Sequence, residues 1–329
     1  MTEVVTFGEC LVAFVASTPG PLAEATTFER FVVGAEANVA VGLARLGHSV
    51  AYIGRVGADG FGDAIARRLR GEGIDLSDLA IDPDAPTGIM FRERRAIGPA
   101  QVVYARSGSA GSRLTAAEIE RAIAQHTDGR WLHLTGITPA LSEGALEATN
   151  RSIESGRAAS MTISLDLNLR RRLWSDEAAA PVLRGLAAGV DVILGSPDEL
   201  AVLTHLTPDH EPAELAWAAL DLGPSVAVVK LGAKGSLAIS RDAPDDVVVR
   251  PAIPLAVVVD PVGAGDAFCA GFIAARLDGA DLGTSLEMGN ACGAAAASAV
   301  GDTTGLPSRV ELAAILRGAA DPGSHDTIR

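Results

Sequence analysis

The 329-residue sequence contains only three cysteines, and nothing in their spacing pairs them. Cys10, Cys269 and Cys292 form no C-x-x-C motif and no even-numbered framework, which excludes a disulfide scaffold and favours reduced thiols in a cytoplasmic protein. No apolar run is long enough to span a bilayer, and the opening "MTEVVTFGEC" lacks both a basic start and a long apolar stretch. We therefore expect neither a membrane span nor a secretory signal.

Positive charge is also scarce. The 27 Lys and Arg residues stand against 41 Asp and Glu residues, which gives a net charge of −14. This balance disfavours nucleic acid or an anionic membrane as the main partner. It does not exclude a phosphate ligand, because a few local donors can hold a phosphate inside an acidic protein. Hydrophobic residues at 48% and charged residues at 21% are typical of a globular protein with a substantial core.

Short β-branched segments alternate with longer Ala-, Leu- and Arg-rich segments, which predicts an α/β fold with a mostly parallel sheet. We expect a first strand over Glu3–Gly8, a helix over Glu36–Gly47, and later strands at "WLHLTG", "MTISLDLN", "VDVILGS" and "SVAVVKLG". Residues 11–33 and 87–107 break the alternation and predict an antiparallel β lid inserted into the α/β body. Together these features predict a single domain over residues 1–318, followed by a flexible tail over 319–329.

A glycine-rich turn stands out near the C-terminus. The segment "AVVVDPVGAGDAF" predicts a strand, a turn and then a helix, which is the setting of an anion-binding turn. It is not a Walker A loop, since the sequence contains no Gly-Lys pair, and it lacks the third glycine of a dinucleotide-binding motif. The amides of Gly263, Ala264 and Gly265 are the candidate donors. Asp266, which follows them, is either a helix cap or a reactive carboxylate.

Phosphoryl transfer to a hydroxyl would use both parts of this turn. The attacking hydroxyl needs a base beside it, and the transferred group needs N–H donors for its charge. Asp266 would accept the hydroxyl proton while the amides of Gly263–Gly265 face the phosphate. An Asp with an ordinary pKa of about 3.9 suffices if the transition state is loose and the proton leaves late.

Two signatures in this sequence resemble one enzyme family. "DPVGAGDAFCAGF" resembles the C-terminal signature of the ribokinase-like (PfkB-type) sugar kinases, and "VGAEANVAVGLARLG" with "YIGRVGADGFG" resembles their N-terminal signature. Their order and separation match, so the resemblance covers almost the whole chain. It implies a three-layer α/β/α sandwich with a small β-sheet lid, ATP and Mg²⁺ as cofactors, and self-association through the lid into a homo-oligomer. Parts of the family also use K⁺, a requirement that the sequence leaves open.

The resemblance also implies contacts to the sugar and the metal. In such kinases an asparagine of the first signature and the glycine ahead of it contact sugar hydroxyls, which here are Asn38 and Gly34. Asn38 could equally satisfy backbone groups at a helix start. In "GSPDEL", Glu199 matches a glutamate that organises Mg²⁺ through water, while Ser196 stands where asparagine is common. A solvated glutamate at a helix start is the alternative for Glu199.

Further residues match the family's nucleotide site. "KLGAKGS" resembles its nucleotide-binding strand and turn, so Lys230, Gly232 and Gly235 become candidate ATP contacts, together with the amides of the glycine-rich turn. Without the resemblance this segment predicts only an ordinary hairpin turn. Asn290 lies on a late helix that resembles the one lining the adenine side.

Two segments point to an acidic sugar. "VVYARSGSAGSRL" and "DLNLRRRLW" resemble segments of the 2-keto-3-deoxygluconate kinases. By that resemblance Tyr104 and Arg106 come from the lid and Arg170 from the sheet, with Asn168 nearer the nucleotide phosphates. Guanidinium groups bind a carboxylate bidentately, and a neutral sugar has no need of them. The alternatives are an edge-strand charge for Arg106 and a solvated basic run around Arg170.

Two positions differ from related kinases or are shared with only some of them. Met90 stands where a substrate-facing tyrosine is common, and Asp302 lies where the keto-deoxy-sugar-acid kinases can place another substrate-binding acid or, equally, a loop cap. We expect an ATP-dependent kinase for the primary hydroxyl of a 2-keto-3-deoxy sugar acid. The alternatives are a kinase of a neutral sugar or nucleoside on the same fold and a catalytically idle sugar or nucleotide sensor.

Overall fold

The computed structural model describes residues 2–95 and 100–320. Its central layer is a sheet of the strands β1 (Val4–Phe7), β4 (Val50–Gly57), β5 (Leu79–Asp82), β8 (Trp131–Thr135), β9 (Thr162–Asp166), β10 (Val192–Gly195), β11 (Val226–Lys230), β12 (Ser236–Ser240) and β13 (Ala243–Arg250). The nine strands are ordered β13-β12-β11-β10-β9-β8-β1-β4-β5. All pairs from β5 to β11 are parallel, and β12 and β13 close one edge in antiparallel fashion. The predicted mostly parallel sheet is therefore confirmed.

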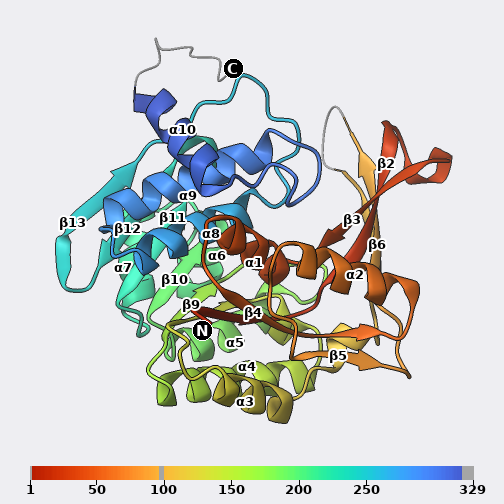
Figure 1. Ribbon diagram of the computed structural model, residues 1–329. Helices are drawn as coiled ribbons and strands as arrows, with labels where there is room; N and C mark the ends of the chain where they lie inside the picture. The colour runs from red at the N-terminus through yellow and green to blue at the C-terminus, as the bar shows by residue number, and fades with distance from the viewer. Residues whose placement is uncertain (1, 96–99, 321–329) are drawn as a thin grey trace.

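Helices cover both faces of this sheet (Figure 1). One layer holds α1 (Ala35–Arg45), α2 (Gly60–Gly71), α8 (Ala264–Leu277), α9 (Leu282–Ala297) and α10 (Arg309–Ala320), and the other holds α3 (Ala116–Gln125), α4 (Glu143–Ala158), α5 (Asp176–Ala187), α6 (Pro197–Thr204) and α7 (Pro212–Leu220). Successive strand side chains feed opposite cores: Val4 packs in the first and Val5 in the second. This is the expected three-layer sandwich.

The order of the strands places a crevice at β1. From β1 the chain adds β4 and β5 on one side, and then returns to add β8 and the later strands on the other side. Beyond the carboxyl ends of strands at such a reversal, α/β sheets bind their ligands. The segments that follow β1, β8 and β9 all begin at this edge.

A second sheet forms the lid, at the right of Figure 1. Its strands are β2 (Leu11–Pro19), β3 (Phe28–Val33), β6 (Ile89–Arg94) and β7 (Val102–Ala105), in the order β3-β2-β6-β7. The outer pairs are antiparallel, as expected, whereas the central pair β2–β6 is parallel. Both central strands leave the carboxyl edge of the main sheet, one after β1 and the other after β5, so they run in the same direction.

One predicted strand is wrong. The valine-rich residues 256–260 form no strand, and Val257 and Val258 are exposed. The backbone N–H groups of Val259 and Asp260 instead donate to the carbonyl of Ala297, at 2.9 and 3.2 Å, where α9 ends. The segment thus satisfies a helix terminus rather than a sheet edge.

The predicted tail falls largely on residues 321–329, which lie outside the described residues, and the single-domain boundary at 318 stays a prediction.

Candidate active site

Helix α8 begins at the glycine-rich turn. Gly263 is its N-cap, with φ 82° and ψ −10°, a left-handed conformation that favours glycine. A Cβ at this position would lie 2.6 Å from the backbone oxygen of Asp302, so the turn packs directly on the loop after α9. The N–H groups of the first helical turn have no acceptor within the helix. That of Ala264 forms a long turn contact to the carbonyl of Pro261, at 3.3 Å.

Asp266 is buried in the first turn of α8 and faces two amides. Asn38 Nδ2 of α1 donates to its Oδ2 at 2.7 Å, and Asn168 Nδ2, just after β9, donates to its Oδ1 at 3.1 Å. The carboxylate therefore points to side chains from other elements instead of capping its own helix. Burial raises the pKa of Asp266 to about 7, against the hydrogen bond from Asn38 and the charge of Arg170, with Asp166 adding to the rise. A carboxylate with this pKa is a stronger base than the Asp of ordinary pKa that the sequence analysis considered.

Asn38 joins two acids. Its Nδ2 also donates to Asp302 Oδ2, at 3.2 Å, while its buried Oδ1 has no partner among the described residues. Asp302 is itself buried, and burial raises its pKa despite the opposing charge of Arg92. Gly34, the N-cap of α1, lies so close to the Glu9 carbonyl that a Cβ would stand 2.6 Å from it. Close packing against this carbonyl therefore requires a glycine at position 34.

The three arginines after β9 behave differently. Arg171 pairs with Asp176 at the start of α5, at 2.8 Å, and Arg172 donates to the Val102 carbonyl of lid strand β7, at 2.7 Å. Arg170 is exposed, and its guanidinium makes no hydrogen bond or ion pair with any residue that the structure describes. Its positive charge nevertheless acts to lower the pKa of Asp266, against the effect of burial. Arg170 is the arginine of this run that is available to a ligand.

Arg106 is occupied by a residue that sequence reasoning missed. Its Nε donates to Glu9 Oε2 at 2.6 Å, and Glu9 also accepts a hydrogen bond from Ser109. The guanidinium lies 5.5 Å from the ring centre of Tyr104, within cation–π range. Glu9 lies two residues after the end of β1, at the crevice edge, so its position in "FGEC" was the available signal. Met90 is buried with Leu11 in the lid and offers no hydroxyl.

Lys230 lies beside the glycine-rich turn. Its Nζ is 2.6 Å from Asp166 Oδ1 and 3.5 Å from where a Cβ on Gly265 would stand. Burial opposes the charged form of Lys230, but Asp166 outweighs this and raises the pKa. Lys230 thus brings a permanent cation to the turn. The hairpin that follows contains Gly232, which faces open space, and Gly235, which packs on the backbone at Arg250.

Two predicted contacts are held by the protein itself. Asn290 Nδ2 donates to the carbonyls of Arg250 and Pro251, at 3.2 and 3.0 Å, and so anchors the end of β13. Glu199 accepts the N–H of Leu169 at 2.9 Å and that of Ser196 at 2.8 Å, closing a capping box at α6. These contacts fix both side chains, and their ligand roles stay predictions.

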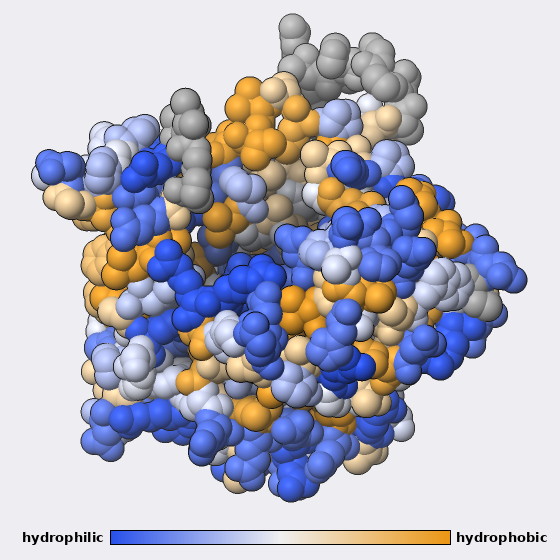
Figure 2. Space-filling model, turned by 180° about the vertical axis from the view of Figure 1, so that it is seen from behind, coloured by the Kyte–Doolittle hydropathy of each residue, from blue (hydrophilic) through white to orange (hydrophobic). Residues whose placement is uncertain are grey.

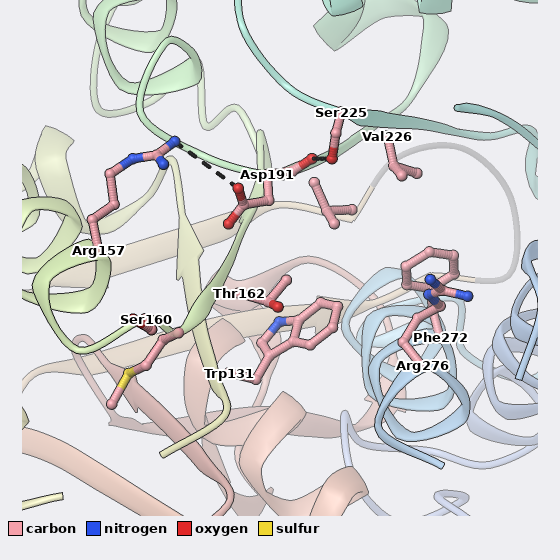
Figure 3. Close-up of a pocket in the computed structure, with 11 residues that line it drawn as sticks. Trp131, Arg157, Ser160, Thr162, Asp191, Ser225, Val226, Phe272 and Arg276 are labelled. Atoms are coloured by element: carbon pink, nitrogen blue, oxygen red, sulfur yellow. Dashed lines mark hydrogen bonds and ion pairs between the residues drawn. The ribbon is translucent and has the colours of Figure 1, made fainter. Parts of the chain in front are cut away.

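A separate cavity of about 500 Å³ lies at the opposite, amino edge of the sheet (Figure 3). Trp131, Thr162, Val192 and Val226 begin the strands that border it. On opposite sides lie Arg157 and Arg276, in the last turns of α4 and α8, where cations complement the helix dipole. The glycine-rich turn lies at the start of α8, whereas Arg276 of this cavity lies at the end of that helix, so the two places are separate.

Comparison with known sequences gives one consistent result. Residues 1–309 match the family model described as pfkB family carbohydrate kinase. The chain is 36% identical to a 2-dehydro-3-deoxygluconokinase of Thermoproteus tenax, over 96% of this chain and 95% of that one. Identity to the 2-dehydro-3-deoxygluconokinase of Bacillus subtilis is 38%, over 95% of each. Fructokinase-1 of Oryza sativa is 32% identical, over 96% of this chain and 98% of the other.

Solved structures agree with this result. A candidate ribokinase II from E. coli in complex with ATP and Mg²⁺ aligns with a TM-score of 0.87 at 27% identity, covering 96% of this chain and 99% of the other. A 2-dehydro-3-deoxygluconokinase of Thermotoga maritima gives a TM-score of 0.85 at 25% identity, covering 96% and 98%. A fructokinase double mutant of Vibrio cholerae, with fructose, ADP and potassium ion bound, gives 0.83 at 28%, covering 96% and 98%.

Proposed function

Because the chain belongs to the pfkB family of carbohydrate kinases, we propose that it phosphorylates a 2-keto-3-deoxy sugar acid with ATP. The substrate that fits best is 2-keto-3-deoxygluconate (also called 2-dehydro-3-deoxygluconate), with its primary 6-hydroxyl as the acceptor. The two 2-dehydro-3-deoxygluconokinases stand at 36% and 38% identity, whereas the Oryza sativa fructokinase stands at 32%. The fructokinase alternative therefore fits less well.

One observation carries the proposed chemistry: Asp266 is buried at the mouth of α8, between Asn38 and Asn168. A pKa of about 7 suits a general base at neutral pH. Asp266 takes the proton of the 6-hydroxyl as its oxygen bonds to the γ-phosphorus, while the bond from phosphorus to the ADP oxygen breaks. The amides of Gly263, Ala264 and Gly265 donate to the moving phosphoryl group, and Lys230 adds a positive charge beside them.

Recognition of the sugar acid would fall to Arg170 and Asn38. The unpaired guanidinium of Arg170 can bind a carboxylate bidentately, and the unpartnered Oδ1 of Asn38 can accept from a sugar hydroxyl. Arg106 and Tyr104 would contact the substrate together as one part of the lid, since Glu9 already binds Arg106. Asp302 and Gly34 complete the substrate side.

The proposed ATP side comprises Asn168, Lys230, Gly232, Gly235, Gly263, Gly265 and Asn290. Magnesium bound there would neutralise the negative charge of the phosphates. Such ions are held mainly by substrate phosphates, water and one or two carboxylates. Within residues 2–95 and 100–320 no group of three or more His, Cys, Asp or Glu forms a metal cage. Glu199, anchored by two backbone donors, is the proposed carboxylate that acts through water.

Potassium belongs to the proposal as a candidate activator, since the Vibrio cholerae fructokinase mutant carries this ion. Replacing K⁺ by Na⁺ at constant ionic strength is the direct assay.

A cytoplasmic location is also proposed, supported by cysteines that are all free and buried. No helix in the described part of the chain is long and apolar enough to cross a membrane.

The lid is the proposed interface of a homo-oligomer. Phe14 and Phe91 stack at 5.3 Å on one lid face, and Phe28 meets Phe91 edge-on at 5.7 Å. Val103 pairs with Phe91 on the same face and is 45% exposed. In Figure 2 apolar surface gathers on the lid side of the molecule. A second lid packed on this face would bury these side chains.

The experiment that tests the proposal is a coupled ADP assay with keto-deoxy acids, aldonic acids and neutral hexoses. We expect turnover with 2-keto-3-deoxygluconate, and a loss of at least about 10³-fold in kcat for Asp266→Asn with substrate affinity within a few-fold. Near-normal turnover of Asp266→Asn would remove the assigned base. Preferred turnover of fructose would favour the neutral-sugar alternative, and no turnover with the whole panel would favour the sensor.

A further inference from the structure

A buried ion pair connects the lid to the loop of the glycine-rich turn. Arg92, on lid strand β6, donates to Asp260 through both terminal nitrogens, at 2.9 and 2.5 Å. Arg92 is 6% exposed and Asp260 is 9% exposed, so the pair lies largely out of water. Arg92 shares its lid face with Met90, two residues earlier, and that face is the inner one.

Asp260 also shapes the turn itself. Its Oδ1 accepts the N–H of Val262 at 3.2 Å, directly before Gly263, and its Oδ2 accepts the N–H of Gly301 at 3.3 Å. One carboxylate therefore holds the start of the glycine-rich turn, the loop that carries Asp302, and a lid arginine. A shift of Arg92 would move all of these together.

The lid touches this loop a second time. A Cβ on Gly301 would stand 2.5 Å from the ring of Phe31, on lid strand β3. The neighbouring Asp302 packs against Gly263 and shares the amide of Asn38 with Asp266. Contacts thus run without a break from two lid strands to the carboxylate at the mouth of α8.

We propose that the Arg92–Asp260 pair couples the lid to the glycine-rich turn. A sugar acid bound under the lid would then position the turn for binding ATP. Arg92 is then a positioning residue, and this inference rests on the proposed kinase function. The two ligands should consequently bind cooperatively. Removing the bidentate contact should weaken that cooperativity more than it weakens either ligand's own binding.

The pair has a chemistry that suits positioning better than stability. Both members of a buried ion pair lose their hydration. Replacing such a pair by well-packed apolar residues often leaves the stability of a protein unchanged or raises it. The Nε of Arg92 is buried and has no hydrogen-bond partner among the described residues, which adds to that loss. What the bidentate contact supplies is a fixed geometry between two elements, because the planar guanidinium admits few arrangements.

Calorimetry tests the proposal on the full chain. The affinity for 2-keto-3-deoxygluconate is measured alone and with a non-hydrolysable ATP analogue plus Mg²⁺ present. We expect a coupling factor of about 5-fold or more in the wild type and close to 1 in Arg92→Met, with each single-ligand Kd within about 3-fold. The kcat of Arg92→Met should fall about 10- to 100-fold, more than KM changes.

A matched control lies on the same lid. Arg95 follows β6 and pairs with Glu93 at 2.6 Å, and Glu93 bonds otherwise to lid backbone. Arg95→Met removes a lid ion pair without touching the turn and should keep the coupling factor. Arg92→Lys retains the charge but not the bidentate contact, and should lose most of the coupling. If Arg92→Met does not fold, the coupling factor of Arg92→Lys tests the proposal instead.

Three results would overturn the inference: a wild-type coupling factor near 1, an unchanged factor in both Arg92 variants, or an equal loss in Arg95→Met. In each case intact wild-type turnover would leave the proposed function standing. Conversely, a wild-type protein that binds both ligands cooperatively but transfers no phosphoryl group would overturn the proposed function and retain the coupling.

Discussion

Burial gives the Asp266 carboxyl group the acid–base properties that its proposed role as general base requires. In water its proton would leave at a pKa near 3.8, and the anion would take up protons poorly at neutral pH. Burial against α1 and the loop after β9 penalises the charge and raises the pKa to about 7. The two amide donors, Asn38 and Asn168, keep the charged form accessible and orient it.

This shift predicts the pH dependence of the reaction. The base works when deprotonated, so kcat/KM for 2-keto-3-deoxygluconate should rise about tenfold per unit below pH 7 and level off above it. The rise reports Asp266 and should be absent from the residual rate of Asp266→Asn. A profile that is flat from pH 5 to 8, or that falls over this range, would contradict the assignment of Asp266 as the base.

Arg170 and Arg171 are adjacent arginines with opposite expectations. Arg170→Met should raise KM for the sugar acid by about 10- to 100-fold, because a carboxylate then loses its charged donor, and should leave KM for fructose unchanged. Arg171→Met loses only an exposed pair with Asp176 and should change neither value. Steady-state kinetics on both substrates check this. Equal effects of the two variants would refute carboxylate recognition by Arg170.

At the scale of elements, the start of α8 depends on one glycine. Gly263→Ala forces a side chain into a left-handed conformation, at about 1–3 kcal/mol, and against the Asp302 backbone. We expect Tm to fall by several degrees and kcat to fall with it. Gly60→Ala is the control, since α2 also begins there and a Cβ at Gly60 would meet no atom of the described residues within 4 Å. A stable, fully active Gly263→Ala would show that the turn is not fixed by this contact.

Elements were predictable where a local pattern decides them. The alternating pattern identified the parallel strands, and Gly263 to Asp266 marked the start of α8. The valines before Asp260 misled, because a β-branched run has the same local preference whether it joins a sheet or satisfies a helix end, as it does at Ala297. The parallel β2–β6 pair depends on where two distant strands leave the main sheet, which no local pattern contains.

Side-chain partners were predictable only in part. Asn38, Asp266 and Asp302 are far apart in the sequence. Only the resemblance of the chain to the sugar kinase family suggested that they lie in one site. Which arginine stays free could not be read from the run Arg170–Arg172, because the answer lies with Asp176 and the lid carbonyl of Val102. The pairing of Arg106 with Glu9 spans 97 positions, which is likewise beyond local inference.

At the scale of the whole molecule, the lid presents an apolar face that carries Phe14, Phe91 and Val103. A charge on that face should block association while sparing the fold. We expect Val103→Asp to convert a dimer or larger assembly into monomers at micromolar concentration, as measured by light scattering after size exclusion. Val310→Asp on α10 is the matched control, because that valine is 76% exposed and lies on a different layer. A wild-type monomer would contradict the lid interface.

Because the chain has a net charge of −14, the binding of an anionic substrate requires local positive charge. We assign that selection to Arg170, whose guanidinium has no partner among the described residues. The most direct test is competition: the wild-type enzyme receives equal 2-keto-3-deoxygluconate and fructose with limiting ATP and Mg²⁺, and mass spectrometry counts the two phosphorylated products. We predict a large excess of the phosphorylated sugar acid. Fructose phosphate in equal or greater amount would show that the site does not select the sugar acid.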